Sequence, residues 1–94
     1  MFGLSEEIYN QIMKIVKKHK CNFLIFGSRA RSDYRNNSDI DIAITTKISE
    51  KEENEIKNEF DLLDIPYTID LVFVEKIEKK ALIDSIKKEG VRLL

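Results

Sequence analysis

Residues Asn22 to Ile44 read NFLIFGSRARSDYRNNSDIDIAI, and this stretch contains the strongest indications of how the chain folds. It opens with a short apolar run rich in strand-forming residues, which Gly27 ends, and that pattern predicts a buried strand. It closes with the segment from Asp39 to Ile44, where Ile alternates strictly with Asp or Ala. Such alternation is typical of a strand with one face in the core. The polar residues between them predict a loop or a short helix that joins two strands.

Amphipathic helices are predicted on either side of these strands. Apolar residues from Ile8 to Val16 recur at helical spacing, and Ser5 is placed to cap that helix. Ser49 and Glu52 form the S-x-x-E pattern of a capping box, which opens a second helix. Pro66 cannot lie inside that helix and marks its end.

The remainder of the chain predicts one more strand and one more helix. The strand runs from Tyr67 to Val74, with Asp70 as its only charged residue. Gly90 fits the C′ position after the last helix, and residues Val91 to Leu94 can add a short edge strand. The apolar stripe of the last helix consists of Ile77, Ala81, Leu82, Ile83 and Ile86. We therefore expect a single domain over residues 1–94, of the α/β or α+β class, with helices packed on one face of a sheet.

Composition excludes several classes of protein. Sixteen Lys and Arg against 17 Asp and Glu leave a formal net charge of −1, which argues against direct binding of nucleic acid. The single cysteine, Cys21, excludes an internal disulfide framework and a zinc site built from several cysteines. No apolar run approaches the ~20 residues of a membrane span, and the N-terminus lacks the features of a signal peptide. We expect a cytoplasmic protein that does not bind membranes.

Three aspartates on the predicted strands are candidate metal ligands. Asp39 and Asp41 leave the same face of one strand, roughly 6.6–6.8 Å apart at the backbone. If the strand with Asp70 is its neighbour, three carboxylates converge, and their mutual repulsion requires a counter-charge. Mg²⁺ binds oxygen ligands together with substrate phosphates, and two such ions can hold the attacking and leaving oxygens of a phosphoryl displacement. The alternative is that these aspartates are ordinary solvent-facing residues of half-exposed strands.

Gly27 and Ser28 directly follow the first buried strand and are candidates for phosphate binding. Glycine allows a close approach of the backbone to a ligand. Ser28 can cap a short helix whose free N–H groups bind anions, and its hydroxyl can donate to a phosphate oxygen. The segment from Gly27 to Ser38 carries three arginines against one aspartate, a net charge of +2. Taken alone the pair is only a turn, and it matches neither a P-loop nor a dinucleotide-binding fingerprint.

In combination these residues resemble a nucleotidyltransferase of the DNA polymerase β superfamily. The signature of that superfamily is Gly-Ser, a spacer, Asp-x-Asp and a third acid on a later strand. In this chain the signature reads Gly27-Ser28, ten residues, Asp39-Ile40-Asp41 and then Asp70. The local sequence GSRARSDYRNNSDIDIAI is similar to that of the minimal nucleotidyltransferases, whose pattern has GSRARG followed by SDIDL. The resemblance covers the whole chain in length and order of elements.

The resemblance implies a nucleotidyltransferase fold with a small mixed sheet, and a reaction. A nucleoside triphosphate, ATP by preference, loses pyrophosphate as its nucleoside monophosphate passes to an acceptor hydroxyl. By this resemblance Asp39 and Asp41 bind two Mg²⁺ ions. Asp70 binds the catalytic ion and helps to deprotonate the acceptor.

The resemblance also assigns the phosphate contacts. Gly27 and Ser28 are expected to hold the β- and γ-phosphates, and Arg29 and Arg31 are expected to contact phosphate or a partner. Ser32 departs from the pattern of the minimal nucleotidyltransferases, which often have glycine there. This change affects the short helix and removes no metal ligand.

Minimal nucleotidyltransferases are commonly the antitoxins of HEPN/MNT toxin–antitoxin pairs, and this implies a partner. We expect an enzyme that AMPylates a tyrosine of a HEPN-type ribonuclease toxin, inactivates it and forms a hetero-oligomer with it. A chain of 94 residues leaves no room for an acceptor-binding domain, so we expect the acceptor to supply its own recognition surface. The alternatives are an antitoxin that acts by binding alone, or transfer to a small molecule or RNA.

A few other residues receive simpler interpretations. His19 ends a lysine-rich helix and is expected at the surface or as a helix cap. Cys21 borders a buried strand and is expected in the core. Tyr34 either stacks on a nucleobase or is an exposed loop residue. Tyr67 is expected to contribute to packing.

Overall fold

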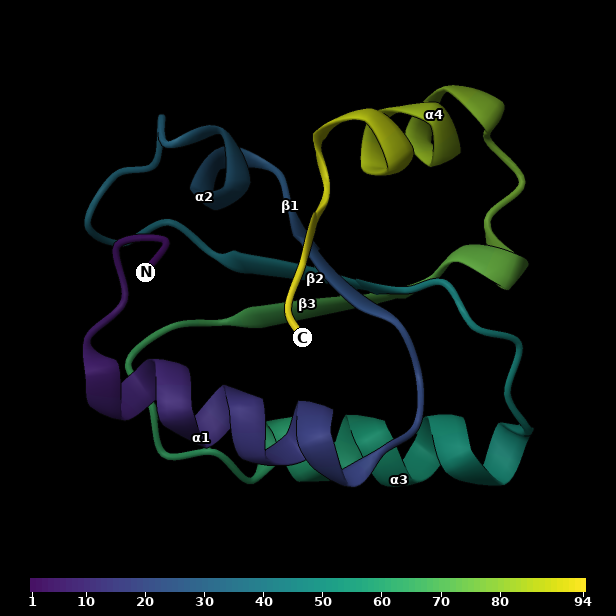
Figure 1. The fold of residues 1–94 in the computed structure, drawn as a ribbon, viewed down its shortest axis with the longest axis horizontal. Coiled ribbons are helices and arrows are strands. Elements are labelled where there is room, and N and C mark those ends of the chain that lie inside the picture. The colour runs from purple at the N-terminus through teal and green to yellow at the C-terminus, as the bar shows by residue number, and fades with distance from the viewer.

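The computed structural model describes all 94 residues, which form a four-stranded sheet with helices on both of its faces (Figure 1). The elements in chain order are α1 (Glu6–Lys18), β1 (Phe23–Phe26), α2 (Ser28–Arg31), β2 (Ile40–Ile44), α3 (Glu50–Asp61), β3 (Ile69–Phe73), the 3₁₀ helix η1 (Val74–Lys76), α4 (Lys80–Glu89) and β4 (Val91–Arg92). The strand order is β3-β2-β1-β4. Only β2 and β3 are parallel, so the sheet is mixed, and the predicted fold class is confirmed.

Both predicted helix caps are present. The Ser5 hydroxyl accepts a hydrogen bond from the Ile8 amide at 3.2 Å, and the Ser49 hydroxyl accepts one from the Glu52 amide at 3.2 Å. The helices α1 and α3 therefore begin where the sequence indicated, because these side chains satisfy amide groups that the first helical turn leaves free.

The main core lies on the face of the sheet that α1 and α3 cover (Figure 1). The alternation in β2 puts Ile40, Ile42 and Ile44 on this face, where each is at most 1% exposed. They pack in one cluster with Ile12 and Val16 of α1 and with apolar residues of α3. The opposite face of β2 therefore carries Asp41 and Ala43, as the period of two requires.

The expectation that helices pack on only one face of the sheet is wrong, because α2 and α4 lie on the opposite face (Figure 1). Helix α4 packs over β1 and buries Ile86 completely. The predicted stripe of α4 is narrower than expected, because Ala81 and Leu82 are exposed. Ile77 precedes the helix, which begins at Lys80.

Gly90 ends α4, but for a different reason from the one predicted. Its backbone is extended, with φ −65° and ψ 138°, and so it is not a left-handed C′ glycine. A Cβ at this position would overlap the Ile86 carbonyl oxygen and lie 3.1 Å from Leu24 Cδ1. The close approach of the backbone to the last turn of α4 therefore favours glycine here, and the tight contact with β1 adds to this. The predicted edge strand follows at once as β4, which is limited to Val91–Arg92 and pairs with β1.

None of the helices combines the length and the apolar character that a membrane span needs.

His19 is buried between α1 and α3 and does not lie at the surface, although it is the C-cap of α1. Its Nε2 is 2.6 Å from Glu59 and its Nδ1 is 3.2 Å from Glu52. Burial opposes protonation of the ring, but the hydrogen bonds to Glu59 and Glu52 outweigh it, so the pKa of His19 is raised. The pKa of Glu59 is lowered, because its bonds to Lys18 and His19 outweigh its own desolvation.

We expect these ionic contacts to make stability depend on pH. The folded-state pKa of His19 exceeds its unfolded value. The contribution of His19 to the free energy of unfolding is therefore complete below about pH 6.5 and is lost as the pH rises through the folded-state pKa. Urea denaturation across this window should show a falling free energy of unfolding. The variant His19→Gln should show a flatter dependence. Equal pH slopes in the two proteins would contradict the assignment.

Candidate active site

The pairing of β2 with β3 brings two of the three predicted acids side by side. In this parallel pair Asp41 lies directly opposite Asp70. The neighbouring strands that convergence of the acids requires are therefore present. Asp39 lies two residues before Asp41, immediately ahead of β2, and is exposed, as is Asp70. All three are accessible from the face of the sheet opposite the main core.

Gly27 lies directly against the middle acid of this group. It has φ 75° and ψ −154°, a conformation that is almost restricted to glycine. A Cβ at Gly27 would overlap a carboxylate oxygen of Asp41 and lie 3.3 Å from its Cγ. The register of β1 with β2, which pairs Phe26 with Asp41, causes this close approach. The Gly-Ser turn and the Asp-x-Asp strand therefore meet at one point.

The acids repel one another. Burial raises the pKa of Asp41, and the negative charges of Asp70 and Asp39 raise it further. The positive charge of Arg31 lowers it in part. Excess negative charge that one arginine offsets only partly is the environment that a bound cation would relieve.

The donor set fits a divalent cation such as Mg²⁺, because it consists of carboxylate oxygens next to an open surface. No group of three His, Cys, Asp or Glu side chains is already gathered around one point. The side chains of Asp39, Asp41 and Asp70 would therefore have to move closer together to hold one ion between them.

Ser28 is the first residue of α2 and not its cap. Gly27 occupies the N-cap position, and no side chain caps the helix. The helix closes at Ser32, which is left-handed with φ 69° and ψ 19°. This conformation explains why glycine suits the position in the related pattern. The helix still forms with serine there.

Arg31 is the last residue of α2 and connects this helix to α4. It donates to Glu89 at 2.7 Å and to Asp33 at 3.1 Å, and its side chain is 45% exposed. Its charge acts on Asp41, so it is near enough to the carboxylates to influence a bound anion. Sequence reasoning missed Glu89, because nothing in the local sequence of α4 distinguishes it from other exposed acids.

Arg29 does not point toward the acids. It is 1% exposed, and its guanidinium donates to the backbone carbonyls of Ser38 and Phe2. Its donors are therefore committed within the protein, and the expected contact with phosphate or a partner is replaced by a structural one. Tyr34 and Tyr67 pack on its guanidinium, so Tyr34 is neither free to stack on a base nor fully exposed.

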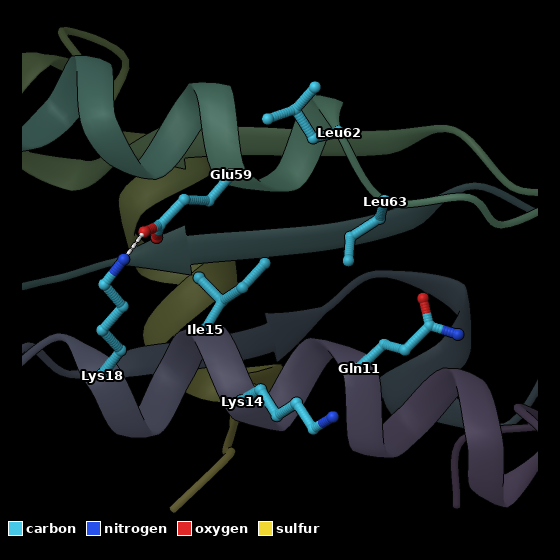
Figure 2. A pocket seen from close by; sticks show the side chains of 7 residues that line it. All are labelled: Gln11, Lys14, Ile15, Lys18, Glu59, Leu62 and Leu63. Atoms are coloured by element: carbon cyan, nitrogen blue, oxygen red, sulfur yellow. Dashed lines mark hydrogen bonds and ion pairs between the residues drawn. The ribbon is translucent and has the colours of Figure 1, made fainter.

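A hollow of about 340 Å³ lies away from these residues, between α1 and α3 (Figure 2). Its lining residues are Gln11, Lys14, Ile15, Lys18, Glu59, Leu62 and Leu63. The ion pair of Lys18 with Glu59 crosses one end of it, as Figure 2 shows. No predicted site residue lines this hollow, so the candidate site is an open surface of the sheet.

Comparison with known families agrees with this geometry. The family model described as "Polymerase beta, Nucleotidyltransferase" matches residues 10–94. The chain belongs to the polymerase β-type nucleotidyltransferase family. A comparison with curated proteins found no match.

Several solved structures share the fold. One, described as a toxin–antitoxin with AMP-PNP, has a TM-score of 0.67 and 25% identity, over 92% of this chain and 72% of the other. A mutant of the toxin–antitoxin MntA-HpeT has a TM-score of 0.64 and 23% identity, over 92% and 71%. The toxin–antitoxin MntA-HepT has a TM-score of 0.61 and 23% identity, over 96% and 72%. The chain thus shares its fold with structures described as toxin–antitoxin complexes.

We expect opposite effects from two substitutions that flank α2. Gly27→Ala should lower the free energy of unfolding by about 1–3 kcal/mol, because it adds a Cβ in a glycine conformation and against Asp41. Ser32→Gly should raise it by about 0.5–1 kcal/mol, because it relieves a left-handed serine. Urea denaturation measures both. A neutral Gly27→Ala would mean that the turn does not approach Asp41 as described.

Proposed function

We propose that this nucleotidyltransferase moves AMP from ATP to a tyrosine hydroxyl of a partner protein, and that it is the antitoxin of a HEPN-type ribonuclease. The observation that carries the proposal is the pairing of Asp41 with Asp70 directly beside Gly27. Family membership supports nucleotidyl transfer as the reaction class. The toxin–antitoxin similarity supports the partner, and the AMP-PNP of one such structure supports an adenine nucleotide.

In the proposed reaction Asp39, Asp41 and Asp70 hold Mg²⁺, with two ions at full occupancy. When bound, Mg²⁺ neutralises the charge that develops on the triphosphate. Gly27 and Ser28 hold the β- and γ-phosphates, and Arg31 adds positive charge at their edge.

The acceptor oxygen attacks the α-phosphorus and the bond from that phosphorus to the oxygen of the β-phosphate breaks. Pyrophosphate leaves. The proton of the acceptor hydroxyl passes to Asp70, which is exposed beside Asp41 and can be reached by an incoming side chain.

The openness of the site supports a protein acceptor. Asp39 and Asp70 are exposed on the sheet surface, and no enclosed cavity surrounds them. A small acceptor would have little surface to bind, whereas a tyrosine presented by a folded partner brings its own contacts. The net charge of −1 disfavours RNA as the acceptor.

The test is transfer of label from ATP that carries a labelled α-phosphate. The purified protein, Mg²⁺ and a lysate of the source cell should yield one labelled protein band in which AMP is joined to a tyrosine oxygen by a phosphodiester bond. The double variant Asp39→Asn/Asp41→Asn should incorporate about 100-fold less label, because the main electrostatic contacts to the transition state are gone. ATP labelled at the γ-phosphate is the matched control: kinases of the lysate label other proteins with it, but the band that depends on Asp39 and Asp41 should stay unlabelled, because in nucleotidyl transfer that label leaves as pyrophosphate.

Other outcomes would change the proposal. Label on RNA or on a small molecule would retain nucleotidyl transfer and overturn the protein acceptor. An absence of label with the partner present, together with full neutralisation of the toxin by the double variant, would indicate an antitoxin that acts by binding alone.

A further inference from the structure

We propose that Arg29 is the positioning residue of this site: its buried guanidinium fastens together the three chain segments that carry Ser28, Asp39 with Asp41, and Asp70. The expected effect of Arg29 on metal binding rests on the proposed function. The physical contacts that support it stand independently of the reaction.

The guanidinium of Arg29 makes a set of directed hydrogen bonds. Its Nε and Nη2 donate to the Ser38 carbonyl oxygen at 3.2 and 2.8 Å. Its Nη1 donates to the Phe2 carbonyl oxygen at 3.0 Å. Ser38 immediately precedes Asp39, so the contact holds the end of the loop from which the Asp-x-Asp strand starts.

Two aromatic rings complete the surroundings of Arg29. The guanidinium carbon lies 4.6 Å from the centre of the Tyr67 ring and 5.2 Å from that of Tyr34. Tyr67 leads into β3, which carries Asp70. Arg29 itself follows Ser28 in α2. One side chain thus contacts the lead-in to each strand of acids and belongs to the segment of the phosphate-binding turn.

The N-terminal turn is held against the same cluster. The Leu4 amide donates to the Met1 carbonyl at 3.0 Å and closes this turn. Gly3 has φ 74°, and a Cβ there would overlap the Tyr34 ring. The first residues of the chain therefore close over the cluster that contains Arg29, and they help to exclude water from it.

Arg29 makes no ion pair, although Arg31 close by makes two. A buried charge is costly unless hydrogen bonds compensate it. Here carbonyl oxygens and ring faces do so, and they suit the planar fork of arginine better than the point charge of lysine. Lysine could therefore reproduce only part of these contacts.

The experiment compares Arg29→Met and Arg29→Lys with the wild-type protein by two readouts. The first is hydrogen exchange in residues 32–38 and 67–70. The second is the Kd of Mn²⁺, measured without nucleotide by electron paramagnetic resonance. Removal of a group that orients metal ligands typically weakens metal binding 10–100-fold, so we expect a rise of about that size in Arg29→Met. Arg29→Lys should show a smaller rise in the Kd of Mn²⁺ than Arg29→Met.

Two control variants separate positioning from general stability. Arg92→Met makes the same chemical change at an exposed arginine with one side-chain hydrogen bond. Ile56→Val lowers stability from the α3 side of the core. Neither should alter the Kd of Mn²⁺ or the exchange of the two segments.

Tyr67→Leu is a second test variant, which keeps the hydrogen bonds of Arg29 and removes one ring. It should increase exchange in residues 67–70 even if Arg29→Met does not fold.

The results decide between the possible roles. The proposal would be overturned if hydrogen exchange and the Kd of Mn²⁺ were unchanged in both Arg29 variants and in Tyr67→Leu. It would also be overturned if Ile56→Val weakened Mn²⁺ binding and increased exchange in the two segments as much as Arg29→Met does. If the wild-type protein binds no Mn²⁺ at all, the proposed function fails, whereas faster exchange confined to the two segments would still support Arg29 as the residue that fastens them.

Discussion

The parallel pairing of β2 with β3 is the constraint on which this site depends. It places Asp41 beside Asp70 on one face, while Ile40 and Ile42 enter the core on the other. Burial raises the pKa of Asp41, and the like charges of Asp70 and Asp39 raise it further. An apolar layer over this end of the sheet would make that repulsion worse. The helices on this face, α2 and α4, therefore leave Asp39 and Asp70 exposed.

The two faces of the sheet are stabilised in different ways. The face under α1 and α3 relies on a cluster of apolar side chains. The contacts of His19 with Glu52 and Glu59 also link α1 to α3. The site face combines the apolar contact of Ile86 under α4 with directed polar contacts, chiefly those of Arg29 with backbone carbonyls and of Arg31 with Glu89. Polar contacts suit a functional surface, because they set positions without covering the groups that must meet a substrate.

Much of this fold follows from local sequence, because periodicity and capping act over a few residues. The alternation at Ile40 to Ile44 and the cap at Ser49 indicated their elements directly. The pairing of Asp41 with Asp70 needed the family resemblance, because contacts between distant segments leave no local pattern. Arg29 was misjudged for the same reason: an arginine beside a Gly-Ser turn resembles a phosphate ligand, and only the fold shows that Ser38 and Phe2 surround it.

The central claim is that the three aspartates hold a divalent cation beside the Gly27 turn. A crystal grown with Mn²⁺ and AMP-PNP and measured at the manganese absorption edge tests it most directly. The account predicts an anomalous peak between Asp41 and Asp70, at about 2.0–2.6 Å from carboxylate oxygens, with the triphosphate over Gly27 and Ser28. Manganese and nucleotide bound elsewhere, with Asp41 and Asp70 uncoordinated, would contradict it.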